Sequence, residues 1–307
     1  MIVVVAPGQG SQTPGFLAPW LELPGARARL EALGAEAGVD LVAAGTQWDA
    51  DAIRDTAVAQ PLIVAAGLLT LTALGTSGVG GIAGHSVGEL TAAAGAGILT
   101  DDEAIRLVAE RGRAMAEAAA LEPTGMAAVL GGDPEDVLAA LEARGLVAAN
   151  MNGGGQTVAA GPRDAIGLLA AEPPTGARVI PLQVAGAFHT RYMAPAVERL
   201  RAAADRLSPA DPALPIWTNR DGSRIESGRT FLDLIVGQVA NPVRWDLVMD
   251  SLAAAGVTGV IELAPAGALV GLVKRGLKGV PTVAVKTPDD LAAARGMIEA
   301  QGDGEGR

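Results

Sequence analysis

One segment constrains the fold of this chain more than any other. A short apolar strand at residues 81–84 leads through the sequence GHSVG, residues 84–88, into an Ala-rich helix. This sequence matches G-x-S-x-G, a sharp strand-to-helix turn in which the glycines avoid clashes and the serine is held in a strained conformation. The Ser86 hydroxyl is expected to stand above the sheet, where helix N–H groups can stabilise an oxyanion. The alternative is a glycine-rich turn with an incidental serine, which the strand–turn–helix context disfavours.

Strand and helix patterns alternate along the chain, starting with the apolar run Ile2 to Ala6. This predicts an α/β protein with a mainly parallel sheet covered on both faces. Between residues 123 and 185 the order becomes βαββαβ, a ferredoxin-like arrangement. We expect a core of residues 1–122 and 186–307 and a small subdomain of residues 123–185. The expected helices are 24–38, 60–74, 87–97, 101–120, 133–143, 162–171, 192–207, 230–239, 245–255 and 269–278; the further strands are 126–130, 146–150, 156–160, 177–182, 216–219, 259–262 and 280–285; residues 301–307 are expected to be a mobile tail.

Composition excludes several classes of protein. The 307 residues include no cysteine and two histidines, which excludes a disulfide scaffold, thiol chemistry and a His-rich metal site. The 23 Lys+Arg against 34 Asp+Glu give a net charge of −11, which argues against a nucleic-acid partner. The apolar N-terminus is too short to span a membrane, and residues 60–74 have the length of a buried core helix. We expect a cytoplasmic protein without a membrane segment.

A nucleophilic serine needs a base, and only two imidazoles are available. His85 is adjacent to Ser86, but neighbouring side chains diverge on a tight turn, so we expect it to pack behind the turn. His189 follows 103 residues after Ser86, where the small subdomain returns to the core and a cleft can form. His189 is therefore the favoured base, although a single histidine is more often a surface or core residue.

The loop GQGSQ, residues 8–12, follows the first strand. Its glycines allow backbone N–H groups to approach a ligand closely. In nucleophile-elbow enzymes the oxyanion hole uses the N–H after the serine and one from another loop, which here indicates Val87 and Gln9. A phosphate-binding loop is the rival interpretation, but the spacing and the lysine that it requires are missing.

Five motifs occur in order along the chain. They are GQGSQ at residues 8–12, GHSVGE at 84–89, ERGRAM at 110–115, FHT at 188–190 and QVANPVRW at 238–245. Together they resemble the malonyl-CoA:acyl carrier protein transacylases, relatives of the acyltransferase domains of fatty-acid and polyketide synthases. The resemblance covers almost the whole chain and implies an α/β-hydrolase-like core with a ferredoxin-like small subdomain, in a monomer.

The resemblance also assigns roles to residues. It implies Ser86 as nucleophile and His189 as base, with the imidazole oriented by the backbone carbonyl of Gln238 instead of a carboxylate. Phe188 matches an aromatic position of malonyl-selective relatives, where a bulky ring limits room for a methyl branch. Asn150 and Asn152 match an Asn-rich turn and are expected to line the site at most.

Arg111 matches the family residue that binds the malonyl carboxylate. A planar guanidinium suits this task because it donates two parallel hydrogen bonds to a carboxylate. Without the resemblance, Arg111 would be read as an exposed helical residue paired with Glu110, Glu117 or Asp101. Arg113 points elsewhere on the same helix and is the natural control.

The implied reaction is ping-pong acyl transfer from malonyl-CoA to holo-acyl carrier protein, with no bound cofactor and no metal. Because carrier proteins of this kind are acidic, docking to a chain of charge −11 needs a local basic patch, and Lys274 and Arg275 are the candidates. Their plain interpretation is charge at a helix C-terminus. Two rival functions remain: a serine thioesterase or esterase, and a catalytically silent carrier-binding subunit.

Overall fold

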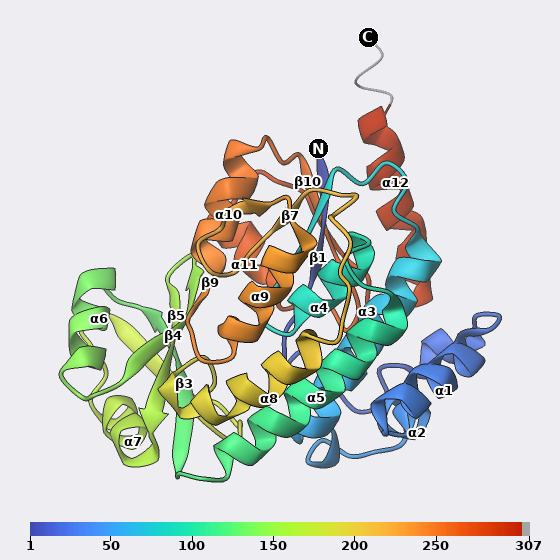
Figure 1. Cartoon of the computed structure of the whole chain (residues 1–307). Coiled ribbons are helices and arrows are strands. Elements are labelled where there is room, and N and C mark those ends of the chain that lie inside the picture. The colour runs from blue at the N-terminus through green and yellow to red at the C-terminus, as the bar shows by residue number, and fades with distance from the viewer. Residues whose placement is uncertain (303–307) are drawn as a thin grey trace.

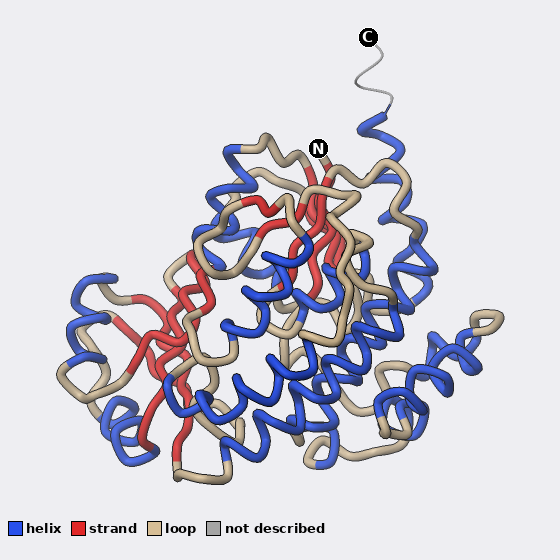
Figure 2. Tube along the Cα trace, viewed as in Figure 1, coloured by secondary structure: helices blue, strands red, loops and turns tan. Residues whose placement is uncertain are grey.

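The computed structural model describes residues 1–302 and contains two sheets, which Figure 2 shows as two groups of strands. The larger sheet has six strands in the order β11-β10-β1-β2-β7-β8, and only β7 and β8 pair antiparallel. The expectation of a mainly parallel sheet is therefore confirmed. Its strands are β1 (Ile2–Ala6), β2 (Gly81–Gly84), β7 (Ile216–Trp217), β8 (Arg224–Ile225), β10 (Gly259–Glu262) and β11 (Thr282–Ala284).

The second sheet is formed mainly by a continuous segment with the element order βαββαβ, and lies to one side of the large sheet (Figure 1). Its strand order is β6-β3-β5-β4-β9, antiparallel except for the β4–β9 pair. The fifth strand comes from a later part of the chain and joins the small sheet to the core. The elements are β3 (Thr124–Gly131), α6 (Pro134–Glu142), β4 (Val147–Gly153), β5 (Gln156–Pro162), α7 (Arg163–Ala171), β6 (Ala177–Pro181) and β9 (Val243–Arg244).

Most of the remaining helices lie around the large sheet in Figure 1, whereas α1 (Ala26–Ala37) and α2 (Leu41–Thr46) lie farther out and pack on other helices. The others are α3 (Thr56–Leu74), α4 (Gly88–Gly95), α5 (Asp101–Ala119), α8 (Ala194–Ala204), α9 (Gly228–Gln238), α10 (Trp245–Ala254), α11 (Leu269–Gly276) and α12 (Leu291–Gly302), with short 3-10 helices at Ala18–Glu22, Ala52–Arg54, Arg191–Met193 and Pro288–Asp290.

Strand β1 shows why both faces of the large sheet are covered. Ile2, Val4 and Ala6 belong to a core shared with α3, α4 and α5, whereas Val3 and Val5 belong to a second core shared with α10 and α11. Successive side chains on a strand point to opposite faces, so an uninterrupted apolar strand requires a cover on each.

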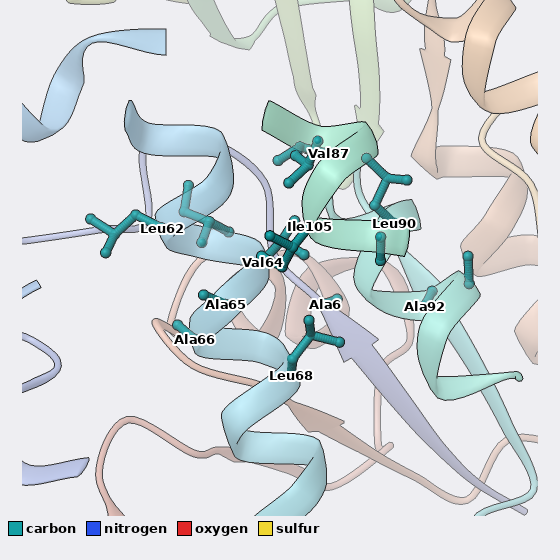
Figure 3. Packing of buried hydrophobic residues seen from close by; sticks show 14 of the residues in the cluster. Ala6, Leu62, Val64, Ala65, Ala66, Leu68, Val87, Leu90, Ala92 and Ile105 are labelled. Carbon is teal, nitrogen blue, oxygen red and sulfur yellow. The ribbon is translucent and has the colours of Figure 1, made fainter. Parts of the chain in front are cut away.

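The first core fixes the position of the helix that follows the serine. Figure 3 shows Val87 and Leu90 of this helical region beside α3, near Val64, with Ile105 of α5 close by. Val87 and Leu90 are almost completely buried, so the start of α4 cannot move without opening the core.

Within residues 1–302, α3 is the one helix long and apolar enough to cross a membrane, judged by length and composition. Its most apolar window is 78% buried inside the fold. The expectation of a core helix in this region is confirmed.

The differences from the sequence predictions lie mainly in short elements and ends. Helix α2 and strands β8 and β9 were not predicted, and α11 ends at Gly276, so Lys278 lies outside it. Helix α12 was not predicted, and it includes Gln301 and Gly302, so the expected tail does not begin at residue 301. The rest of that expected tail, residues 303–307, lies outside the described residues.

Candidate active site

The serine lies in the turn between β2 and α4. Its backbone is left-handed, with φ of 53°, as the strained turn requires. A Cβ atom at Gly84 would lie within 3.0 Å of the Gly88 backbone, and one at Gly88 would lie equally close to the carbonyl of Ala6. Both glycines are therefore needed for the turn to pass this close to β1.

Ser86 and His189 are brought together although 103 residues separate them. Ser86 Oγ lies 2.7 Å from His189 Nε2, and His189 Nδ1 lies 2.8 Å from the backbone carbonyl oxygen of Gln238. Gln238 is the last residue of α9, where carbonyl groups carry partial negative charge, and its carbonyl also accepts the Asn241 N–H at 3.1 Å. The end of a helix thus occupies the place that an aspartate takes in a Ser-His-Asp triad.

His189 is held neutral over a wide pH range. Burial, and secondly the positive charge of Arg111, lower its pKa to about 3, while the hydrogen bond from Nδ1 to Gln238 opposes this shift. A neutral imidazole with Nδ1 donating leaves Nε2 as an acceptor for the serine proton. The site is therefore suited to base catalysis from Nε2.

Arg111 is buried on α5, with 1% of its surface exposed, and makes no ion pair with the residues that an exposed arginine would contact. Its Nη1 donates to Gln60 Oε1 at 2.7 Å and its Nη2 to Gln238 Oε1 at 2.9 Å; Nη2 also lies 3.4 Å from Ser86 Oγ. Burial lowers its pKa to about 10, so it remains a cation at neutral pH. Arg113, by contrast, is half-exposed and pairs with Glu110.

Two backbone N–H groups beside Ser86 are free to bind a ligand. Within residues 1–302, the N–H groups of Gln9 and Val87 have no hydrogen-bond acceptor. The Gln9 side chain is fixed by Nε2, which donates at 3.4 Å to both the Arg54 carbonyl and Thr56 Oγ1. Both residues border the same cavity as Ser86. The loop and the turn are thus placed as an oxyanion hole requires, and that role stays a prediction.

The cavity at Ser86 has a volume of about 80 Å³ and lies between loops and helices of the core and strands of the small sheet. Phe188 and His189 line it from the core, and Asn150 from the small sheet. Within residues 1–302, two buried polar atoms at this cavity lack a hydrogen-bond partner, Nε of Arg111 and Oδ1 of Asn150. Unpaired buried groups are costly, so a polar ligand here would restore lost hydrogen bonds.

A wider groove of about 690 Å³ continues outward from this cavity. The loop of residues 8–12 forms one wall, and Asn152 and Arg275 also line it. Lys274 is exposed next to Arg275 but does not line the groove. The structure therefore brings Arg275 to the site entrance and leaves Lys274 outside it.

His85 packs and forms a hydrogen bond, as the sequence predicts, but it does not lie wholly behind the turn, because it lines both the cavity at Ser86 and the outer groove. Its Nε2 is 2.8 Å from Asn152 Oδ1, and its ring packs edge-to-face on Trp245 with centroids 5.6 Å apart. Burial lowers the pKa of His85 below its usual range. These contacts connect the turn to the small sheet and leave His189 as the imidazole on Ser86.

Three site residues were missed by sequence reasoning: Gln60, Glu89 and Asn219. Each is at most 1% exposed. A polar residue inside the most apolar helix could have drawn attention to Gln60, and Glu89 stands within the GHSVGE motif. Asn219 gives no local signal, because its contacts with Gly84 and Ser86 span more than 130 residues.

Comparison with known proteins identifies the family of this chain. Residues 3–294 match the acyl transferase domain family. The malonyl CoA-acyl carrier protein transacylase of Mycobacterium tuberculosis is 51% identical over 296 residues, which cover 95% of this chain and 98% of that protein. The chain belongs to the malonyl CoA-acyl carrier protein transacylase family.

Solved structures of this family agree with the fold. The crystal structure of MCAT from Mycobacterium tuberculosis superposes with a TM-score of 0.93 at 50% identity, covering 96% of this chain and 99% of that one. A second structure is a malonyl-transacylase in complex with its type II PKS acyl-carrier protein. It has a TM-score of 0.88 at 30% identity and covers 95% of this chain and 98% of its own. The α/β fold with a parallel and an antiparallel sheet is therefore that of the family.

Proposed function

We propose that this protein transfers a malonyl group from malonyl-CoA to the phosphopantetheine thiol of acyl carrier protein through an ester on Ser86. The observation that carries the proposal is a buried arginine, with no partner for its Nε atom, 3.4 Å from a serine that contacts a neutral histidine. A hydrolase of uncharged esters has no use for a buried cation beside its nucleophile, whereas an enzyme for an anionic acyl group does.

In the first half-reaction, His189 Nε2 accepts the proton of the Ser86 hydroxyl as Oγ attacks the thioester carbonyl carbon. The resulting oxyanion is bound by the N–H groups of Gln9 and Val87. The intermediate collapses by breaking the carbon–sulfur bond, and His189 returns its proton to the departing coenzyme A sulfur. The products are coenzyme A and malonyl-Ser86.

The second half-reaction is the reverse with a different thiol. The phosphopantetheine thiol of the carrier gives its proton to His189 and attacks the ester carbonyl, and the same N–H groups hold the oxyanion. His189 then protonates Ser86 Oγ as the ester bond breaks. Malonyl-acyl carrier protein leaves, the serine is regenerated, and neither half-reaction requires a bound cofactor.

Arg111 binds the malonyl carboxylate and thereby also tunes the base. Its positive charge is one cause of the low pKa of His189, so a carboxylate bound beside it offsets that repulsion and makes the imidazole more basic. Gln238 orients His189 through its backbone carbonyl. Phe188, buried at the same cavity, favours malonyl over methylmalonyl by limiting room for a methyl branch.

The outer groove suits the pantetheine arm shared by coenzyme A and the carrier, and Lys274 and Arg275 form the basic surface that receives the acidic carrier. Support comes from Arg275 at the entrance and from the relative whose structure contains an acyl-carrier protein. We assign residues 1–122 and 186–307 to an α/β-hydrolase-like core and 123–185 to a ferredoxin-like subdomain, in a cytoplasmic monomer.

Intact-mass spectrometry tests the reaction. Incubation with malonyl-CoA should add one malonyl group to the wild-type protein and none to Ser86→Ala, and holo-carrier should then remove it. Release of free malonate at the same rate with and without carrier would instead identify a hydrolase. Failure to detect an ester on Ser86 under any condition would favour a silent carrier-binding subunit.

A further inference from the structure

Glu89 lies in the first turn of α4, and its backbone N–H donates to the Ser86 carbonyl at 3.0 Å. Within residues 1–302, its side chain makes no hydrogen bond with Ser86, His189 or Arg111, but it contacts two residues that do. Its side chain is 1% exposed. Oε1 accepts the backbone N–H of Asn219 at 2.6 Å, and Oε2 accepts the Gln238 side-chain Nε2 at 2.5 Å. The carboxyl group is therefore fixed by two donors that belong to two other parts of the site.

The first donor connects Glu89 to the serine turn. Asn219 Oδ1 accepts the backbone N–H of Ser86 at 2.7 Å, and Asn219 Nδ2 donates to the Gly84 carbonyl at 2.7 Å. Asn219 thus holds both sides of the turn, and Glu89 holds the backbone of Asn219.

The second donor determines how the Gln238 amide is oriented. An amide has one acceptor end and one donor end, and the acceptor end of Gln238 faces Arg111 Nη2 at 2.9 Å. If the amide were reversed, its NH₂ group would face the guanidinium and its oxygen would face Glu89, so both contacts would be lost. The Gln238 NH₂ group donates to Glu89 Oε2 at 2.5 Å and, at the longer distance of 3.2 Å, to Asn219 Oδ1. The shorter contact, to Glu89, is the main one that selects the orientation that satisfies Arg111.

We infer that Glu89 is a positioning residue that fixes the Gln238 amide, so that a neutral oxygen holds Arg111 and its charge stays available for the anionic acyl group. This inference rests on the proposed function of Arg111. The amide acts as a spacer: a carboxylate in direct contact with Arg111 would compete with the substrate for the guanidinium and cancel its charge.

The protonation of Glu89 is consistent with this role. Burial raises its pKa to about 8, against the opposing effects of the Asn219 hydrogen bond and the Arg111 charge. At neutral pH the group therefore adds little negative charge beside Arg111. A protonated carboxyl still accepts from Gln238, and a reversed amide would still turn its NH₂ group toward Arg111, so the observed orientation of the amide is retained.

The first test is Glu89→Gln, which keeps the shape but places an NH₂ group against one of the two donors. Acyl loading of Ser86 is measured by mass spectrometry with malonyl-CoA and acetyl-CoA. We expect kcat/KM for malonyl loading to fall about 10- to 100-fold and that for acetyl loading by less than about threefold, since the lost contact serves Arg111. In an Arg111→Ala background the same change should alter malonyl loading by less than about twofold.

The second test keeps the inference falsifiable if Glu89→Gln folds poorly. The exchange Glu89→Gln with Gln238→Glu restores a donor–acceptor contact between the two side chains but puts a carboxylate directly on Arg111. We expect a thermal midpoint close to that of the wild type, recovered acetyl loading and weak malonyl loading. Recovery of malonyl loading would overturn the spacer role.

Glu110→Gln is the matched control. Glu110 precedes Arg111 on α5, pairs with Arg113 and Arg199 at the surface, and makes no contact with Gln238. We expect it to leave both loading rates within about twofold. An unchanged malonyl-to-acetyl ratio in Glu89→Gln, whether both rates fall or neither does, would overturn the inference. Absence of malonyl-Ser86 in the wild type would instead overturn the proposed function.

Discussion

The two residues of the proposed catalytic pair both have left-handed backbones, with φ of 53° at Ser86 and 61° at His189. Such values are unfavourable for non-glycine residues and persist only where neighbours impose them. The Ser86 N–H is held by Asn219 Oδ1 at 2.7 Å, and the His189 N–H by the Val239 carbonyl at 3.0 Å. Backbone strain thus fixes the direction of both side chains before any substrate arrives.

Arg111→Ala tests the charge beside the nucleophile. We expect kcat/KM for malonyl loading to fall about 100-fold or more, since charge-assisted hydrogen bonds to the carboxylate disappear, while uncharged acyl groups load relatively better. Competition between malonyl-CoA and acetyl-CoA, read by intact mass, measures the ratio. Arg113→Ala, at the surface of the same helix, should leave the ratio unchanged. Equal malonyl loading by Arg111→Ala and wild type would contradict the carboxylate assignment.

The pH profile tests the state of His189. Burial and the Arg111 charge lower its pKa to about 3, so the base stays neutral as the pH falls through the range in which an ordinary histidine becomes protonated. An ordinary histidine would cost about tenfold in kcat/KM between pH 7.5 and pH 5.5. We expect less than about a twofold change in malonyl loading over this interval. An acid limb centred near pH 6.5 would contradict the prediction.

At the scale of elements, the position of the serine turn depends on the close packing of α4 against β1. A Cβ atom at Gly88 would lie within 3.0 Å of the Ala6 carbonyl on β1, so Gly88→Ala must push the helix away from the strand. We expect a loss of at least about 2 kcal/mol in unfolding free energy and a lower thermal midpoint, together with slow acyl loading. Differential scanning calorimetry and loading rates measure both effects.

Gly167→Ala is the comparison for that variant. Gly167 lies in α7, where an added Cβ atom meets no neighbour within 4 Å. Alanine should therefore stabilise the helix by up to about 1 kcal/mol and leave loading unchanged. A Gly88→Ala protein as stable as Gly167→Ala would mean that the turn has more room than its geometry indicates.

Long patterned elements could be predicted from sequence, whereas short or weakly patterned ones could not. Helix α5 was predicted at residues 101–120 and is observed at Asp101–Ala119, where Thr100 and Glu103 form a capping box at its start. Strands β8 and β9 have two residues each, too few to show a period, and exist because a neighbouring strand pairs with them.

The candidate site likewise contains residues that sequence could predict and residues that it could not. Ser86 and its two glycines form a short local motif, so sequence alone indicated a nucleophile turn. The family motifs at residues 188–190 and 110–115 then indicated His189 and Arg111. Glu89 and Asn219 act through contacts that span 130 residues, and no local pattern encodes such a contact. The acceptor that orients His189 is the backbone carbonyl of Gln238, for which no residue type is required, so only the family resemblance indicated it.

At the scale of the whole molecule, a net charge of −11 opposes association with an acidic carrier protein. The reversal Lys274→Glu with Arg275→Glu removes two exposed cations next to the groove entrance. We expect the KM for holo-carrier to rise about tenfold or more, with little change in malonyl-CoA loading, because charges at an interface mainly affect encounter. Initial rates at several carrier concentrations and salt concentrations measure this.

A more negative net charge could by itself raise the KM for holo-carrier, so the control variant must have the same net charge. Arg206→Glu with Arg229→Glu makes an equal change of charge at residues that do not line the groove. If the local patch guides the carrier, only the first pair raises KM, and its effect fades with added salt as exposed charges are screened. Equal effects of the two pairs would assign carrier recognition to the overall field, and an unchanged KM in the first pair would remove Lys274 and Arg275 from the docking surface.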